Sequence, residues 1–377
     1  MQPTTIQQLA DYGQSIWLDY ISRSLLESGK LKNLIAQGLR GMTSNPSIFN
    51  QVISSGRDYD ERIIRLKAQG KSTFEIYDAL TIADIQDAAD FFQGVYEKTK
   101  GLDGYVSLEI NPQIAHRVDE QVKEGIRLCT AVQRPNLMIK VPATKEGLTV
   151  AEELIAYGIN VNVTLIFSLQ QYEGAVKAYF KGLNRLTQHQ GDLTKLRSVA
   201  SVFVSRVDTT VDELLDERLA DVSDSIQKEK LQSLKGKAAV ANCRAIFEKY
   251  RELFGGGAFK VLKEKGADIQ RVLWGSTSTK NPQYSDIKYV TELIARPTVN
   301  TIPEKTLHAF LDHGCIQEAF TYPASQSKDL LAQLKNLGID ADRICQDLLH
   351  DGVVAFEDAF QALLASIEKK AAQLCAP

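Results

Sequence analysis

Lys140 lies in a segment where a charged side chain is unexpected. It interrupts the apolar run Leu137–Val141, which is bounded by Pro135 and Pro142. A short apolar run of this kind is typical of a buried strand in a parallel sheet. Burial of an unpaired ammonium group is costly and favours the neutral amine, which is a nucleophile that forms imines with carbonyl substrates. Lys140 is therefore a candidate nucleophile; the alternatives are a lysine that protects a sheet edge, or one whose side chain reaches solvent.

Polar residues alternate with apolar ones in other segments that we expect to be strands. Asn162 and Thr164 are two residues apart in one segment, and Ser107 and Glu109 are two residues apart in another. Asp19 ends a further apolar run. The apolar residues between them are expected on the opposite face: Val106, Leu108, Ile110, Val161, Val163 and Leu165. Alternate residues of a strand point to the same side, so the polar residues are expected to face one another inside a barrel. Each residue alone could be a capping group at a strand end, but their agreement over several strands favours a shared site.

Eight strands are expected to position these residues. They are Ile16–Tyr20, Gly41–Ser44, Tyr105–Ile110, Leu137–Val141, Asn160–Phe167, Ala200–Val204, Val272–Gly275 and Thr298–Ile302. Helical patterns separate them, and eight strands that alternate with helices favour an α/β fold with a closed parallel (β/α)8 TIM barrel. In such barrels the catalytic groups come from the carboxyl ends of several strands.

The connecting segments predict more helices than a minimal barrel needs. Apolar spacing predicts helices over residues 112–129, 145–157 and 169–186, and further helical segments over residues 46–104 and 208–270. The helical pattern of residues 208–270 ends in a break at Gly255-Gly-Gly257, which could be a linker or a flexible loop. Residues 304–377 are expected to form a C-terminal helical extension packed on the barrel, with a long amphipathic stretch from Asp340 to Leu374. We expect one elaborated barrel domain over residues 1–377.

Composition gives no support for several classes of function. The net charge of −3 gives no support for binding to nucleic acid or to an anionic membrane. Five scattered cysteines form no CxxC pair and five dispersed histidines form no ligand motif, so neither a disulfide framework nor a zinc site is expected. The first residues resemble no secretory signal, and no stretch approaches the ~20 apolar residues that cross a bilayer. We therefore expect a cytoplasmic protein.

Four motifs together resemble the transaldolase family, in its longer bacterial and plant-like type. They are Thr43-Ser-Asn-Pro-Ser47, Asn136-Leu-Met-Ile-Lys140-Val-Pro-Ala-Thr144, Asn162-Val-Thr-Leu-Ile-Phe-Ser168 and Ser201-Val-Phe-Val-Ser-Arg206. Their order and spacing also match, over about residues 10–310. Transaldolases are barrel enzymes of the pentose phosphate pathway that use neither metal nor cofactor. They move a dihydroxyacetone unit from sedoheptulose 7-phosphate to glyceraldehyde 3-phosphate, which yields erythrose 4-phosphate and fructose 6-phosphate.

The resemblance implies a role for each residue of the candidate site. Lys140 would form the Schiff base with the ketose carbonyl. Glu109 would relay protons through a water held by Thr164, and Asp19 would take the proton of the substrate C4 hydroxyl. Three residues would bind hydroxyl groups and a fourth would line the pocket: Asn45, Asn162, Ser201 and Phe203.

The resemblance also implies a cationic site for substrate phosphate. Arg206 matches the family's phosphate arginine, and its alternative is a surface arginine. Ser278 and Lys280 stand where many transaldolases have a serine and an arginine, although this segment is one residue longer and its register is open. A lysine offers positive charge without the bidentate geometry of arginine.

Other functions are compatible with parts of this pattern. A fructose 6-phosphate aldolase would use the same lysine chemistry but release free dihydroxyacetone, and a non-catalytic barrel would only bind sugar phosphates. A metal-dependent lyase or isomerase is disfavoured by the dispersed histidines. The expected partners are small sugar phosphates, with no nucleic acid and no membrane; a homodimer is left open.

Overall fold

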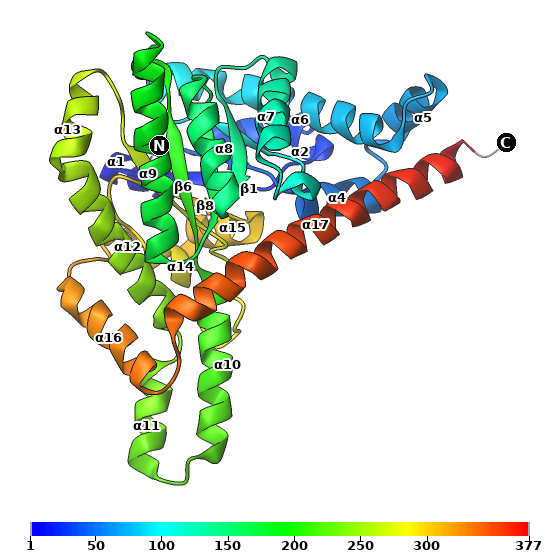
Figure 1. The fold of residues 1–377 in the computed structure, drawn as a ribbon. Coiled ribbons are helices and arrows are strands. Elements are labelled where there is room, and N and C mark those ends of the chain that lie inside the picture. The colour runs from blue at the N-terminus through cyan, green and yellow to red at the C-terminus, as the bar shows by residue number, and fades with distance from the viewer. Residues whose placement is uncertain (1, 376–377) are drawn as a thin grey trace.

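Eight parallel strands close into a barrel in the computed structural model, which describes residues 2–375 (Figure 1). The strands are β1 (Gln14–Asp19), β2 (Gly41–Thr43), β3 (Val106–Glu109), β4 (Leu137–Pro142), β5 (Val161–Ile166), β6 (Ser198–Phe203), β7 (Gln270–Gly275) and β8 (Thr298–Ile302). Each strand pairs with its neighbours in chain order, and β8 pairs with β1. The (β/α)8 barrel and all eight expected strands are confirmed. The expected domain span also included residues 1, 376 and 377, which lie outside the described residues.

Helices surround the barrel and extend beyond it. Those before β5 are α1 (Thr5–Tyr12), α2 (Arg23–Glu27), α3 (Lys30–Ala36), α4 (Pro46–Ser55), α5 (Asp60–Ala68), α6 (Thr73–Lys98), α7 (Val118–Val132), α8 (Lys145–Ala156) and the 3₁₀ turn η1 (Pro112–Ile114). Those after β5 are α9 (Leu169–Gln188), α10 (Ser205–Asp221), α11 (Ser225–Leu234), α12 (Ala238–Gly255), α13 (Gly257–Glu264), α14 (Lys288–Thr291), α15 (Glu304–His313), α16 (Ala324–Asn336), α17 (Ala341–Leu374) and the 3₁₀ turn η2 (Leu193–Lys195).

Local sequence signals explain where these helices begin. Helix α9 starts after a capping box in which the Ser168 hydroxyl and the Gln171 side chain satisfy each other's backbone N–H groups. The predictions for α8 and α9 are confirmed. The prediction of a continuous helix from residue 112 is wrong at its start, because the chain first makes η1 and then begins α7 at Val118.

The interior of the barrel contains a separate apolar layer toward the amino ends of the strands. It consists of Trp17, Tyr105, Met138, Val199, Leu273 and Val299, all buried. A Cβ atom at Gly41 would lie 2.7 Å from the Trp17 indole, so only glycine leaves room for this ring. On the amino-terminal side of this layer, Arg271 forms a buried ion pair with Asp103 at 2.8 Å. This end of the barrel is therefore filled, which leaves the opposite end for a site.

The alternation expected in β5 ends early. Leu165 has a left-handed φ of 59°, and the pairing of β5 with β6 shifts between Val163 and Ile166. A bulge therefore interrupts the strand at Leu165, which still packs in the same apolar cluster as Val161 and Val163.

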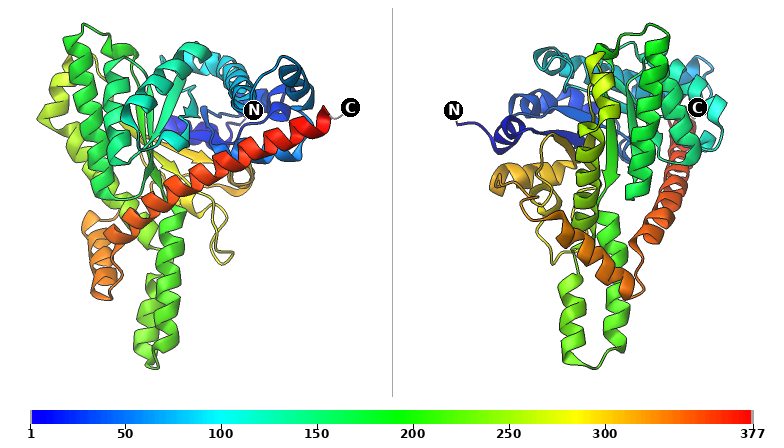
Figure 2. Two further views of the ribbon diagram at one scale, coloured as in Figure 1. Left: turned by 45° about the vertical axis from the view of Figure 1, so that its right-hand side comes forward. Right: turned by 60° about the vertical axis from the view of Figure 1, so that its left-hand side comes forward.

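Three helical segments lie outside the basic barrel. Helices α10 and α11 form a hairpin that projects from the body of the molecule (Figure 2). Helix α12 ends at Gly255 and α13 begins at Gly257, so the glycine run is a bend between two helices. Helix α17 begins after Asp340, whose side chain accepts a hydrogen bond from the Asp342 amide, and it packs on α4, α5, α6 and α10. The expected long C-terminal helix is therefore confirmed. No helix among residues 2–375 is long and apolar enough to span a membrane.

Candidate active site

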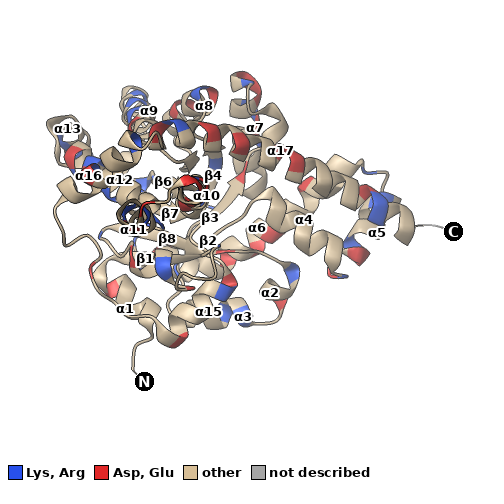
Figure 3. Cartoon of the chain, turned by 90° about the horizontal axis from the view of Figure 1, so that it is seen from below, with Lys and Arg blue, Asp and Glu red and all other residues tan. Residues whose placement is uncertain are grey.

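A cavity of about 250 Å³ opens at the carboxyl ends of the strands. Figure 3 looks at this end of the barrel, where α10 begins and where basic and acidic residues are intermixed on the surrounding helices. Nine of the predicted site residues line the cavity: Asp19, Asn45, Lys140, Thr164, Ser201, Phe203, Arg206, Ser278 and Lys280. Glu109 and Asn162 lie directly beside this set through the contacts described below.

Lys140 is buried near the end of β4, with 4% of its surface exposed. Strand β4 lies between β3 and β5 of a closed barrel, so Lys140 protects no sheet edge. Its Nζ donates hydrogen bonds to the Ser44 carbonyl oxygen at 3.3 Å and to Glu109 Oε2 at 3.4 Å. Both alternatives for this lysine, an edge position and a solvated end, are thereby excluded.

Glu109 is placed beside Lys140 by the register of β3 and β4, in which the two residues are direct partners. Burial raises the pKa of the Glu109 carboxyl to about 7; the charge of Lys140 lowers it and that of Asp19 raises it further. A carboxyl group with this pKa can both give and accept a proton near neutral pH.

Asp19 lies across the cavity at the end of β1. Its Oδ1 accepts a hydrogen bond from the Thr43 hydroxyl at 2.7 Å, and Thr43 also contacts the Thr301 hydroxyl at 2.7 Å. Burial raises the pKa of Asp19, whereas Lys140, the Thr43 hydrogen bond and Lys280 lower it. Neighbouring strands therefore fix the orientation of this carboxylate.

Thr164 and Ser201 line the cavity from β5 and β6, and the Asn162 amide lies beside them. The Asn162 amide donates to Ser107 Oγ at 3.1 Å and accepts from Ser201 Oγ at 2.6 Å. Thr164 is buried, and its hydroxyl has no hydrogen-bond partner among the described residues.

Asn45 caps α4 by accepting a hydrogen bond from the Ile48 amide at 3.0 Å. Its side-chain N–H groups therefore remain available to the cavity.

Cationic side chains lie at the outer rim of the cavity. Arg206 is half-buried at the start of α10, and the Lys280 ammonium donates to Ser278 Oγ at 2.8 Å in the loop after β7. All three residues line the same cavity, so the loop register places Ser278 and Lys280 beside Arg206.

Two carboxylates that the sequence analysis missed connect these cationic segments. Asp208 accepts hydrogen bonds from the Ala239 amide and the Tyr289 hydroxyl, both at 2.7 Å. Asp212 accepts from the Gly236 amide at 2.8 Å and from the Tyr284 hydroxyl at 2.6 Å. The available signal was their spacing of one helical turn directly after Arg206. These bonds tie the start of α10 to the segment that follows Lys280.

Phe356 is a further residue that the sequence analysis missed. It lies on α17 and lines the cavity, with its ring centroid 5.4 Å from Lys140 Nζ. Its sequence neighbourhood is ordinary amphipathic helix, so no local signal marked it.

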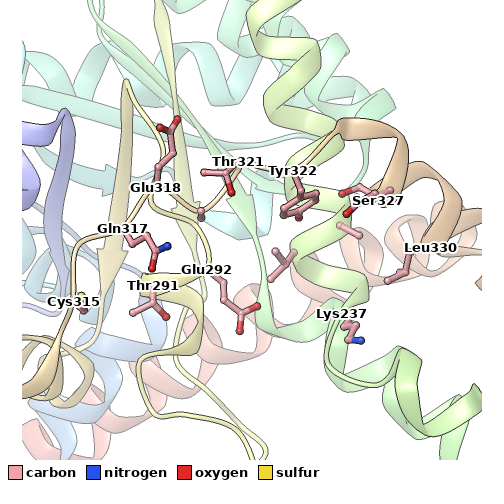
Figure 4. Close-up of a pocket in the computed structure, with 14 residues that line it drawn as sticks. Lys237, Thr291, Glu292, Cys315, Gln317, Glu318, Thr321, Tyr322, Ser327 and Leu330 are labelled. Carbon is pink, nitrogen blue, oxygen red and sulfur yellow. The ribbon is translucent and has the colours of Figure 1, made fainter. Parts of the chain in front are cut away.

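A second cavity, of about 600 Å³, lies between α12, α14, α16 and the loop that precedes α16 (Figure 4). Its lining includes Lys237, Glu292, Cys315 and Tyr322 but none of the predicted site residues. Within residues 2–375, no three His, Cys, Asp or Glu side chains form a group that could hold a metal ion.

Comparison with known proteins agrees with this geometry. Residues 16–367 match the family model described as transaldolase/fructose-6-phosphate aldolase. A protein named transaldolase from Trichodesmium erythraeum is 44% identical over 370 residues, which cover 97% of each chain. Transaldolase 2 from a Nostoc species is 42% identical over 96% of each chain, and transaldolase 1 from Streptomyces coelicolor is 43% identical over 97% of this chain and 94% of its own. The chain therefore belongs to the transaldolase/fructose-6-phosphate aldolase family.

Proposed function

We propose that the protein is a transaldolase that works through a Schiff base on Lys140. It transfers a dihydroxyacetone unit from sedoheptulose 7-phosphate to glyceraldehyde 3-phosphate and yields erythrose 4-phosphate and fructose 6-phosphate. The observation that carries this proposal is the burial of Lys140 Nζ, 3.4 Å from Glu109 Oε2, in the cavity that Asp19 also lines. A buried amine between two carboxyl groups suits imine formation followed by proton transfer.

Asp19 and Glu109 have different roles in this proposal. The Lys140 amine adds to the ketose C2 carbonyl, and Glu109 supplies the proton with which the carbinolamine hydroxyl leaves as water. Its pKa of about 7 suits this exchange, and the unpartnered Thr164 hydroxyl supports a water position between Thr164 and Glu109. Asp19 then takes the C4 hydroxyl proton as the C3–C4 bond breaks, and the electron pair passes into the protonated imine.

The other polar residues would bind the substrate. Asn45, Asn162 and Ser201 would bond to the hydroxyl groups of the three-carbon unit; the Asn162 amide retains a second N–H and a second lone pair for this purpose. Phe203 would line the pocket. Arg206, Ser278 and Lys280 would bind the phosphate group, with Arg206 as the one side chain capable of bidentate contact.

A second candidate is a fructose 6-phosphate aldolase, because the matching family model covers both activities. The two reactions differ in the fate of the three-carbon unit on Lys140. Fructose 6-phosphate supplied without an acceptor aldehyde distinguishes them. A transaldolase releases little dihydroxyacetone, whereas an aldolase releases it at the full turnover rate.

Activity of Lys140→Ala tests the proposal. The wild-type protein is expected to convert sedoheptulose 7-phosphate and glyceraldehyde 3-phosphate, and Lys140→Ala is expected to lose this activity while binding the donor. Donor binding by both proteins without conversion by either would instead support a non-catalytic sugar-phosphate-binding barrel.

We also propose that residues 304–377 act with the barrel as one domain, that the protein works in the cytoplasm and that it can form a homodimer. The five cysteines are all free, which suits a reducing compartment. Light scattering of the purified protein measures the oligomeric state.

A further inference from the structure

Helix α17 carries one aromatic side chain into the candidate active site. The helix runs back across the molecule on the side of the barrel from which α10 projects (Figures 1 and 2). Phe356 is 9% exposed, and its ring lies over the Lys140 ammonium at 5.4 Å. Among the described residues of α17, Phe356 alone lines the substrate cavity. A segment remote in sequence thereby covers the proposed nucleophile.

The close approach of α17 depends on Gly352 and Leu165. A Cβ atom at Gly352 would lie 3.0 Å from Leu165 Cδ2, so a larger residue would require the Leu165 side chain to shift. Gly352 precedes Phe356 by four residues and therefore lies on the same face of the helix. Leu165 has the left-handed backbone of the β5 bulge, an uncommon conformation for a leucine. Helix α17 is thus in close contact with the β5 bulge one turn before Phe356.

A small cavity lies beside the Phe356 ring, and most of its lining is apolar. Its volume is about 10 Å³, close to the space that one water molecule occupies. Glu109 and Gln121 line it, and the buried Oε1 of Gln121 has no hydrogen-bond partner among the described residues. Of the described residues, Phe356 alone lines both this cavity and the substrate cavity. The ring is thus the partition between a water-sized space at Glu109 and the space in front of Lys140.

We propose that Phe356 determines whether the three-carbon unit is transferred or released, an inference that rests on the proposed function. After cleavage of the C3–C4 bond the unit remains on Lys140 as an enamine. In transfer, C3 forms a new bond to the acceptor aldehyde. In release, C3 takes a proton from water, and a water molecule then hydrolyses the imine to free dihydroxyacetone and the lysine amine. The Phe356 ring, which lines the cavity beside Lys140, keeps water from C3 of the neutral enamine until the acceptor aldehyde binds.

Phe356→Leu and Phe356→Met test this proposal, because both fill much of the space without an aromatic ring. Phe360→Leu is the matched control: Phe360 lies one turn further along α17, is fully buried against Tyr77 and lines neither cavity. Each protein is given fructose 6-phosphate and erythrose 4-phosphate in deuterated water. The measured quantity is the ratio of deuterated dihydroxyacetone released to sedoheptulose 7-phosphate formed.

The two Phe356 variants are expected to raise this ratio by roughly tenfold, because the smaller side chains admit water to C3 and lower the barrier to its protonation. The control is expected to stay within about twofold of the wild type, because a buried change away from the site alters stability and not the partition. An unchanged ratio in both Phe356 variants, or an equal rise in Phe360→Leu, overturns the proposal. Failure of the proposed function looks different: the wild-type protein would then either release dihydroxyacetone at its full turnover rate, or form neither product and no borohydride-trapped adduct on Lys140.

Discussion

Replacement of Glu109 by glutamine is expected to stabilise the protein at alkaline pH while it removes activity. Burial raises the pKa of this carboxyl from 4.5 to about 7, despite the neighbouring Lys140. The folded protein therefore holds the proton more tightly than the unfolded chain. This contribution to stability is fully present below pH 4.5 and is lost as the pH rises through 7.

The structure gives the magnitude of this effect. One pH unit between the folded and unfolded pKa values corresponds to about 1.4 kcal/mol, so ionisation of Glu109 costs the folded state about 3 kcal/mol above pH 7. Glutamine has the shape of the neutral carboxylic acid and cannot ionise. The free energy of unfolding of Glu109→Gln should therefore fall about 3 kcal/mol less than that of the wild type between pH 4.5 and pH 8.

Urea unfolding at several pH values, followed by the fluorescence of the buried Trp17 and Trp274, measures this difference. Glu61→Gln is the control, because it makes the same substitution at an exposed residue that does not line the cavity. Parallel pH profiles for wild type and Glu109→Gln would refute the reasoning. Full activity in Glu109→Gln would separately refute its role in proton transfer, for which a loss of roughly 10²–10⁴-fold is expected.

Three further substitutions test the phosphate site and the barrel core. Arg206→Ala should raise KM for phosphorylated donors by roughly 10–100-fold in steady-state kinetics, the effect of a lost charge-assisted contact, and an unchanged KM would exclude Arg206 from phosphate binding. Tyr284→Phe removes the 2.6 Å bond to Asp212 and should raise the same KM by roughly 3–10-fold. Its effect on unphosphorylated fructose should be smaller, and equal effects on both donors would contradict a role in placing the phosphate loop. Gly41→Ala should lower the free energy of unfolding by about 1–3 kcal/mol, because its Cβ would meet the Trp17 ring; a stability equal to the wild type in urea would contradict this packing.

Much of the barrel could be predicted from the sequence because its signals are local. Each strand is a short apolar run between polar or glycine-rich turns, so all eight were located from composition and alternation. Parity predicted that Glu109 faces the interior of the barrel, whereas its direct pairing with Lys140 is set by the register of β3 and β4. The assignment of Ser278 and Lys280 to phosphate binding rests on motif resemblance, since nothing in their local pattern specifies a ligand.

The features that were missed depend on contacts between distant segments. The β5 bulge at Leu165 accommodates α17, almost 190 residues later in the chain, so the strand's own sequence does not reveal it. Phe356 has the same apolar character as the residues that merely pack α17, and only the path of the helix brings it to Lys140. In the sequence, Asp208 and Asp212 resemble ordinary charges on a surface helix. Only the three-dimensional structure shows that tyrosine hydroxyls donate hydrogen bonds to them.

The most direct test of the account is borohydride reduction in the presence of fructose 6-phosphate, followed by mass mapping of the peptides. The account predicts one reduced three-carbon adduct, located on Lys140, and none in Lys140→Ala. An adduct on another lysine, or the absence of any adduct in an active wild-type protein, would contradict it.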